Sequence, residues 1–164
     1  MLDLWPHLRL RIGSRGRVTV SRSVGIAPGV RVTAAHGARV IVFPGAVLGE
    51  GARISAESGT VVVGPDARLG ERAIVVCHAG VTIEAGAVVG DWAAVSDVEP
   101  PLFDSERPVR TQGVVASPVV IGTGARIGPH AVVSASVAAG AVVAPYAVVE
   151  RRADRHPARR GREM

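Results

Sequence analysis

The sequence contains few or no residues of several types, and each of these shortages excludes some folds or functions. Aromatic residues make up only 3% of the 164 residues although 48% are hydrophobic, so Val, Ala, Ile and Leu must fill the core. The single cysteine, Cys77, excludes an internal disulfide and fits a reducing compartment. The chain has no lysine, and therefore no glycine-rich loop followed by lysine that would indicate a nucleotidyltransferase domain.

Long apolar runs are also missing. No stretch approaches the roughly 18 apolar residues of a membrane span, and the arginines near the N-terminus interrupt any signal-peptide core. We therefore expect a cytoplasmic protein. The formal charge of +5 is concentrated in residues 151–164, which carry six arginines against two acids. We expect this basic tail to be disordered, since it has neither aromatic residues nor periodicity; contact with phosphates is the alternative.

What the chain does contain is a six-residue period between residues 12 and 150. An aliphatic residue recurs at Ile26, Val32, Val42, Leu48, Ile54, Val63, Leu69, Val75, Ile83, Val89, Val95, Ile121, Ile127, Val133, Val137, Val143 and Val149. Alanine often stands two positions earlier, and residues two apart in a strand face the same side, so both point inward. The residue between them points outward. Glycine and proline supply tight turns, and the pattern predicts an all-β parallel solenoid with three strands per coil.

The departures from six fall at every third step. The steps of 10, 9, 8, 26 and 4 residues all belong to one corner of a triangular prism, and every other step is 6. That corner collects His36, Glu57, His78, Asp97 and Ser134. A variable edge beside two edges of constant length predicts a binding edge on a rigid scaffold; the alternative is a corner that merely tolerates insertions.

A second corner carries an outward column of rings. Trp92, His130 and Tyr146 each follow an aliphatic inward position by three residues, so they should stack along the prism. Burial between subunits is the favoured explanation for such an exposed apolar surface, and a ligand platform is the alternative. Residues 1–11 should form an N-terminal cap over the open end of the prism.

The repeat, for example AVVGD at 87–91 and ARIG at 125–128, resembles the hexapeptide-repeat acyltransferase superfamily over roughly residues 12–150. The loop 97–118 is more specific. Its segment FDSERPVRTQG at 103–113, followed by PVVIG at 118–122, is similar to the sugar and polysaccharide O-acetyltransferase branch, which includes maltose and galactoside acetyltransferases.

This resemblance implies a left-handed coil, a homotrimer with active sites between subunits, and acetyl-CoA as donor to a sugar hydroxyl. It also implies CoA-binding positions at Ala116, Gly122, Ser134 and Arg151 or Arg152. In the loop, Arg107 and Arg110 are either cations that bind substrate or ordinary surface charges. No metal is expected.

The family uses a histidine near the entry to this loop as general base, but residues 97–118 contain none. The nearest substitute is His78, which lies 19 residues before Asp97, close to one coil, so the two should occupy adjacent rungs. Asp97 would then orient the imidazole and raise its basicity. A binding or structural role for His78 is the alternative. Glu99 is a poorer base, and Cys77 is better explained as a small buried residue than as a nucleophile.

Two other functions remain open. A non-catalytic trimeric scaffold would explain the missing loop histidine but not so long an insertion. A zinc carbonic anhydrase site needs three histidines within metal reach, at roughly 2.0–2.1 Å. His36 and His78 share a corner but lie two coils apart, and His130 lies on another corner, so one subunit cannot make that site; histidines from two subunits are the alternative.

Overall fold

The structure is a computed structural model that describes residues 11–98 and 115–151. The expected N-terminal cap lies almost entirely outside these residues, as do most of the long loop and the tail beyond residue 151. Within the described parts, no helix is long and apolar enough to cross a membrane.

Three parallel sheets form the sides of a prism. Sheet A contains β1 (Arg11–Ser14), β4 (Arg31–Ala34), β7 (Arg53–Ala56), β10 (Ile74–Cys77), β13 (Ala94–Ser96), β16 (Val132–Val133) and β18 (Val148–Val149). Sheet B contains β2 (Arg17–Val20), β5 (Arg39–Val42), β8 (Thr60–Val63), β11 (Gly80–Ile83) and β14 (Val119–Ile121). Sheet C contains β3 (Gly25–Ile26), β6 (Val47–Leu48), β9 (Arg68–Leu69), β12 (Val88–Val89), β15 (Arg126–Ile127) and β17 (Val142–Val143).

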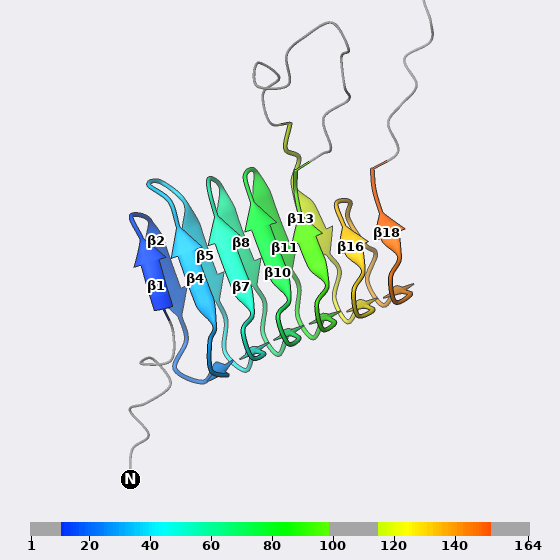
Figure 1. Ribbon diagram of the computed structural model, residues 1–164, viewed down its shortest axis with the longest axis horizontal. Helices are drawn as coiled ribbons and strands as arrows, with labels where there is room; N and C mark the ends of the chain where they lie inside the picture. The colour runs from blue at the N-terminus through cyan, green and yellow to red at the C-terminus, as the bar shows by residue number, and fades with distance from the viewer. Residues whose placement is uncertain (1–10, 99–114, 152–164) are drawn as a thin grey trace, which may run out of the picture.

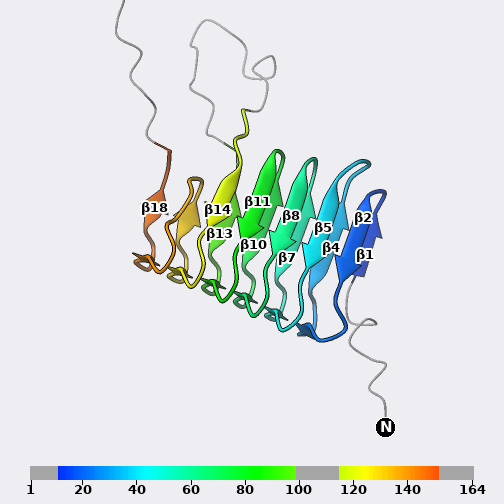
Figure 2. The same cartoon turned by 180° about the vertical axis from the view of Figure 1, so that it is seen from behind.

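The chain coils in the left-handed sense. In Figure 1 the strands of sheet A rise on the near side and those of sheet B descend behind them while the chain advances from left to right. Figure 2, from behind, shows sheet B in front and the same progression reversed. The expected left-handed parallel β-helix is confirmed, against the right-handed preference of ordinary crossovers.

The core consists of the aliphatic residues of the six-residue period. From Val32 to Val133 these side chains are buried, and Ile26, Val143 and Val149 are partly buried and pack against them. The alanines two positions earlier are buried too, as at Ala46 and Ala87, and valine fills the same inward position at Val30 and Val61. Burial of each branched aliphatic side chain stabilises the fold by roughly 1.5–3 kcal/mol.

All the irregular steps meet at the edge between sheets A and B, which we call the insertion corner. Residues 35–38, 57–59, 78–79, 97–118 and 134–136 connect the strands there. The strand register is the same before and after these connections. Val75 pairs with Val95, and Val95 pairs with Val133 on the far side of the long loop. The prediction of a single variable corner is therefore confirmed, and Figure 1 shows these loops along one edge.

The edge between sheets C and A, the C–A corner, carries the outward column. The rings of Trp92 and His130 stack with centroids 6.2 Å apart and an interplanar angle of 6°. Those of His130 and Tyr146 follow at 4.9 Å and 2°. The column begins one coil earlier than the sequence analysis placed it, because the guanidinium carbon of Arg72 lies 5.0 Å from the Trp92 ring centroid. All four residues adopt a left-handed backbone, with φ between 51° and 61°.

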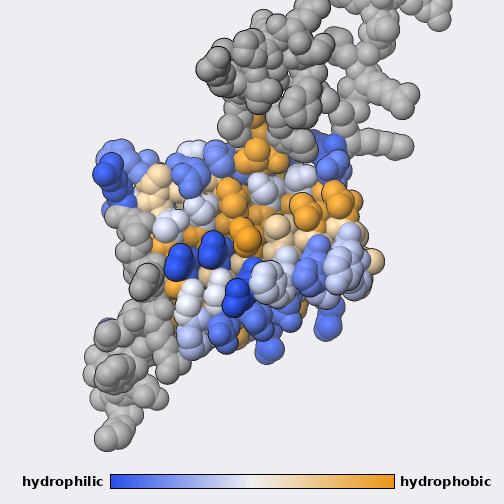
Figure 3. Space-filling view, viewed as in Figure 1, coloured by the Kyte–Doolittle hydropathy of each residue, from blue (hydrophilic) through white to orange (hydrophobic). Residues whose placement is uncertain are grey.

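The outer face of sheet A carries exposed aliphatic side chains on its later coils. Ile74, Val132 and Val148 expose 40%, 45% and 62% of their surface on the later coils. Figure 3 views this face and shows an apolar band bordered on both sides by hydrophilic atoms. Exposed aliphatic groups of this kind favour contact with another protein surface.

Candidate functional site

His78 and Asp97 lie side by side at the insertion corner. His78 follows β10 and Asp97 follows β13, and the pairing of Val76 with Ser96 sets their backbones on adjacent rungs. The long loop leaves the prism directly after Asp97. An antiparallel bridge between Val98 and Ala116 closes the base of that loop, so the pair sits at its mouth.

Asp97 is fully buried, and its carboxylate is hydrogen-bonded to the main chain of residues 78–80 on the preceding coil. Its oxygens accept the N–H of His78 at 2.8 and 3.0 Å, of Ala79 at 2.6 Å and of Gly80 at 2.7 Å. Successive N–H groups that converge in this way form a concave anion site. An ionised carboxylate, which only accepts hydrogen bonds, suits these donors. Asp97 therefore fixes the turn from β10 to β11.

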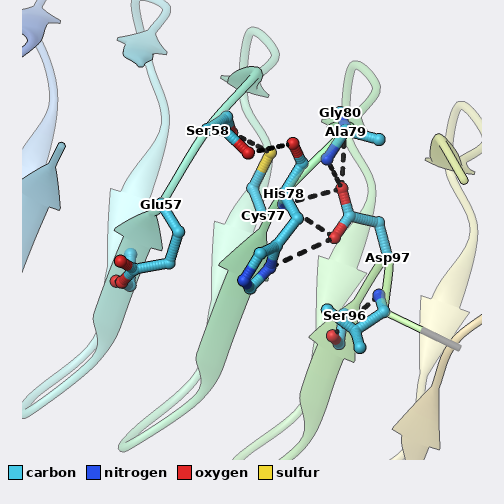
Figure 4. Close-up of polar contacts among 10 residues, drawn as sticks. Glu57, Ser58, Cys77, His78, Ala79, Gly80, Ser96 and Asp97 are labelled. Carbon is cyan, nitrogen blue, oxygen red and sulfur yellow. Dashed lines mark hydrogen bonds and ion pairs between the residues drawn. The ribbon is translucent and has the colours of Figure 1, made fainter. Parts of the chain in front are cut away.

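The imidazole of His78 points toward Asp97 but does not bond to it. Its Nδ1 lies 4.0 Å from Asp97 Oδ1, beyond hydrogen-bond range, and has no hydrogen-bond partner among the described residues although it is buried. The side chain as a whole is 29% exposed, so the ring reaches solvent from its other edge. Figure 4 shows the ring beside Asp97 between β10 and β13.

This geometry suits a base that works through Nε2. The negative charge of Asp97 favours the tautomer with a proton on Nδ1, which leaves the Nε2 lone pair free. A gap of 4.0 Å can close when substrate binds, since catalytic hydrogen bonds are often long in the free enzyme. The amides of Ala79 and Gly80 are occupied by Asp97, so an oxyanion would need other donors.

Two neighbours of His78 stiffen the turn. Ser58, one rung below, donates its hydroxyl to the carbonyl of His78. The buried thiol of Cys77 donates to the carbonyl of Ser58 at 3.3 Å. Burial first, and then the charge of Asp97, raise the pKa of the Cys77 thiol from 9.0 to about 12. A thiol held protonated is a poor nucleophile, so the interpretation of Cys77 as a small buried residue agrees with the structure.

The positions implied for CoA fall on two different edges. Ala116, Ser134 and Arg151 lie near the base of the loop, where an Arg151 guanidinium nitrogen donates to the carbonyl of Pro118 at 3.4 Å. Gly122 lies instead between sheets B and C. A Cβ there would stand 2.4 Å from the backbone nitrogen of Ala139, so close packing of adjacent rungs already explains this glycine.

Several sequence-based expectations cannot be placed. Arg107, Arg110 and Arg152 lie outside the described residues. Of the other histidines, His36 is exposed at the insertion corner, on the coil of β4, and His130 stands in the ring column of the C–A corner. Among the described residues no three His, Cys, Asp or Glu side chains gather closely enough to hold a metal ion.

The sequence analysis missed the main-chain role of Asp97 and the part that Ser58 plays. It placed Asp97 beside His78 by counting residues, but the hydrogen bonds go to amides whose direction depends on the turn. An Asp in a turn is known to bond backbone groups a few residues away, but these N–H groups lie 17 to 19 positions earlier, so that local rule does not reveal them.

Comparison with known proteins finds similarity to solved structures, and the identities are low. No family model matches the chain, and no curated protein matches it. The crystal structure of the CcmM N-terminal domain in complex with CcmN is 22% identical, with a TM-score of 0.48, over 86% of this chain and 98% of that one. AntD, an N-acyltransferase from Bacillus cereus in complex with dTDP and 3-hydroxybutyryl-CoA, is 12% identical, with a TM-score of 0.35, over 87% and 79%.

Proposed function

We propose that this protein is an acyltransferase that moves an acetyl group from acetyl-CoA to a sugar hydroxyl. The observation that carries the proposal is the partly exposed imidazole of His78, set against the buried carboxylate of Asp97 at the mouth of the long loop. A partly exposed histidine whose inner nitrogen faces a carboxylate is a suitable general base near neutral pH.

The chemistry is direct transfer. Nε2 of His78 takes the proton of the acceptor hydroxyl as its oxygen attacks the thioester carbonyl. When the tetrahedral intermediate collapses, the carbon–sulfur bond breaks, and the imidazolium returns the proton to the CoA thiolate. The products are the acetyl ester and free CoA. Asp97, 4.0 Å from Nδ1, stabilises the imidazolium by its charge.

Acetyl-CoA would lie along the insertion corner. Ala116, Ser134 and Arg151 share this edge with His78, and the Arg151 guanidinium is suited to a CoA phosphate. Under this proposal Arg107 and Arg110 of the loop bind the acceptor. We propose a homotrimer as the working form, because Val142, Tyr146 and Val148 expose 75%, 73% and 62% of their surface, as subunit contacts would require.

A non-catalytic scaffold is the second candidate. It is favoured by one observation: the carboxylate of Asp97 accepts hydrogen bonds from the main-chain N–H groups of His78, Ala79 and Gly80 and makes none with the His78 ring. In that case the pair would hold the loop base and do no chemistry.

Calorimetric titration with acetyl-CoA separates the two candidates. The acyltransferase should bind acetyl-CoA at micromolar to millimolar concentration, and Arg151→Gln should weaken that binding. Arg126→Gln is the matched control, because Arg126 is an outward arginine on sheet C, away from the insertion corner. No heat of binding at millimolar acetyl-CoA would remove the proposal and leave the scaffold.

A further inference from the structure

A groove on the opposite edge of sheet A collects three arginines. It has a volume of about 470 Å³ and lies over β4, β7 and the C–A corner, where Arg31, Arg53 and Arg72 line it together with Glu50 and Trp92. Figure 3 shows strongly hydrophilic atoms grouped at the lower border of this face. The length of a four-residue strand, roughly 13 Å, separates this edge from the insertion corner.

Two of the arginines stand side by side without a partner. Arg31 and Arg53 are exposed Cα partners in the β4–β7 register, so their side chains leave the sheet on adjacent rungs. Within the described part of the chain neither guanidinium group makes a hydrogen bond or an ion pair. Like charges directly opposite one another in a sheet are destabilising, and an anion between them removes that repulsion.

The third arginine is held in place by its surroundings. Arg72 adopts a left-handed backbone with φ 51°, which is costly for a residue with a Cβ, and its guanidinium lies over the Trp92 ring at 5.0 Å. Gly51, one rung below, leaves room for it, since a Cβ there would come within 3.1 Å of Arg72 Cγ. Glu71 is only a distant partner, at 4.0 Å from Nε. The guanidinium is therefore positioned before any ligand arrives.

We propose that this groove binds the phosphoryl group of a small molecule other than the acyl donor. Guanidinium groups match the oxygens of phosphate in pairs, and three arginines line this groove. The volume fits a small ligand, and the three cations span only three coils, which is too short a track for a nucleic acid strand. The proposal does not depend on acyl transfer at His78.

Pyrophosphate is the probe for this site, measured by calorimetry with the full-length protein. Wild type should bind it with a dissociation constant below 1 millimolar, on the order expected for two or three charge-assisted contacts. Arg53→Gln should weaken binding about tenfold or more. Gly51→Ala, which displaces Arg72, should also weaken it. Tricarballylate, a carboxylate trianion, should bind at least about tenfold less tightly than pyrophosphate.

Arg39→Gln is the matched control. Arg39 is an exposed arginine that also pairs with an arginine, Arg17, in the β2–β5 register, but this pair lies on sheet B, away from the groove. Its variant should bind pyrophosphate as wild type does. Equal weakening in Arg39→Gln and Arg53→Gln would overturn the proposal, as would equal binding of tricarballylate or displacement of pyrophosphate by acetyl-CoA. Cooperative thermal melts show that each variant is folded, and Gly51→Ala should melt below wild type because Gly51 has φ 66°.

Discussion

The carboxylate of Asp97 accepts the backbone N–H of His78 at 2.8 and 3.0 Å, while the imidazole Nδ1 of the same residue lies 4.0 Å away. One acid thus secures the main chain at the mouth of the loop and places its charge beside the ring. These two roles can be separated by experiment, because the first affects stability and the second affects catalysis.

Replacement of Asp97 by Asn should destabilise the fold. Asn has one carbonyl oxygen, and its NH2 group would face amide donors, so buried N–H groups would lose their acceptor. We expect the free energy of unfolding to fall by about 3 kcal/mol, measured by urea denaturation. Asp91→Asn is the control, since exposed Asp91 accepts a single N–H, from Glu71 at 2.8 Å; its loss should stay below about 1 kcal/mol. Equal losses in the two variants would contradict the role assigned to Asp97.

Replacement of His78 by Gln should remove the base and leave the donor site intact. We expect kcat for acetyl transfer to fall by about 10²- to 10⁴-fold, with acetyl-CoA affinity unchanged by calorimetry. Turnover is measured as release of the CoA thiol against a panel of sugars. His36→Gln, an exposed histidine two coils away on the same corner, should keep wild-type turnover. Wild-type kcat in His78→Gln would show that the base lies elsewhere.

Cys77 should not react in the native protein. Its buried thiol, with a pKa of about 12, is almost wholly protonated at pH 8. A colorimetric disulfide reagent should therefore modify no thiol in native protein and one per chain in 6 M urea, a number that follows from the single cysteine. Rapid reaction of native protein at pH 8 would show that the thiol is accessible.

The same thiol gives stability a pH dependence. Its pKa is raised from 9.0 in the unfolded chain to about 12 in the folded protein, so between these values the folded state holds a proton that the unfolded chain has lost. Below pH 9 the thiol is protonated in both states and does not reduce the free energy of unfolding. Above pH 9 the free energy of unfolding should fall by up to about 1.4 kcal/mol per pH unit. Denaturation from pH 8 to 10.5 should show this slope relative to Cys77→Ala. Parallel curves for the two proteins would exclude it.

Because the turns of the ring column are left-handed, the protein with glycine at position 130 should be more stable than the protein with alanine there. His130 has φ 58°, a conformation that costs a residue with a Cβ about 1 kcal/mol or more. Both substitutions remove the stacked ring, but only glycine releases this cost, so His130→Gly should unfold at higher urea concentration than His130→Ala. At Thr82, an extended position in β11, the order should reverse. The same order at both positions would contradict the left-handed turn.

The core and the insertion corner could be predicted because they depend on spacing alone. Every third aliphatic position meets its counterpart on the next coil, as Val75 meets Val95, whatever the chain does at the corner between them. The same counting gives Arg72, three residues after Leu69 as Trp92 is three after Val89, so the start of the ring column was within reach of the sequence. The groove needed more. Spacing places Arg31 and Arg53 on adjacent rungs, but the space that Gly51 leaves and the position of the Arg72 guanidinium over Trp92 follow only from the coordinates.

The pairing of Val95 with Val133 has a practical consequence for engineering. Because the coils on both sides of residues 97–118 stay aligned, the segment between Val98 and Ala116 is an appendage whose length and chemistry can be exchanged without rebuilding the scaffold. Donor loops from other proteins could be grafted between Val98 and Ala116, whose bridge marks natural splice points. The other two edges, built to a constant length, would not accept such grafts.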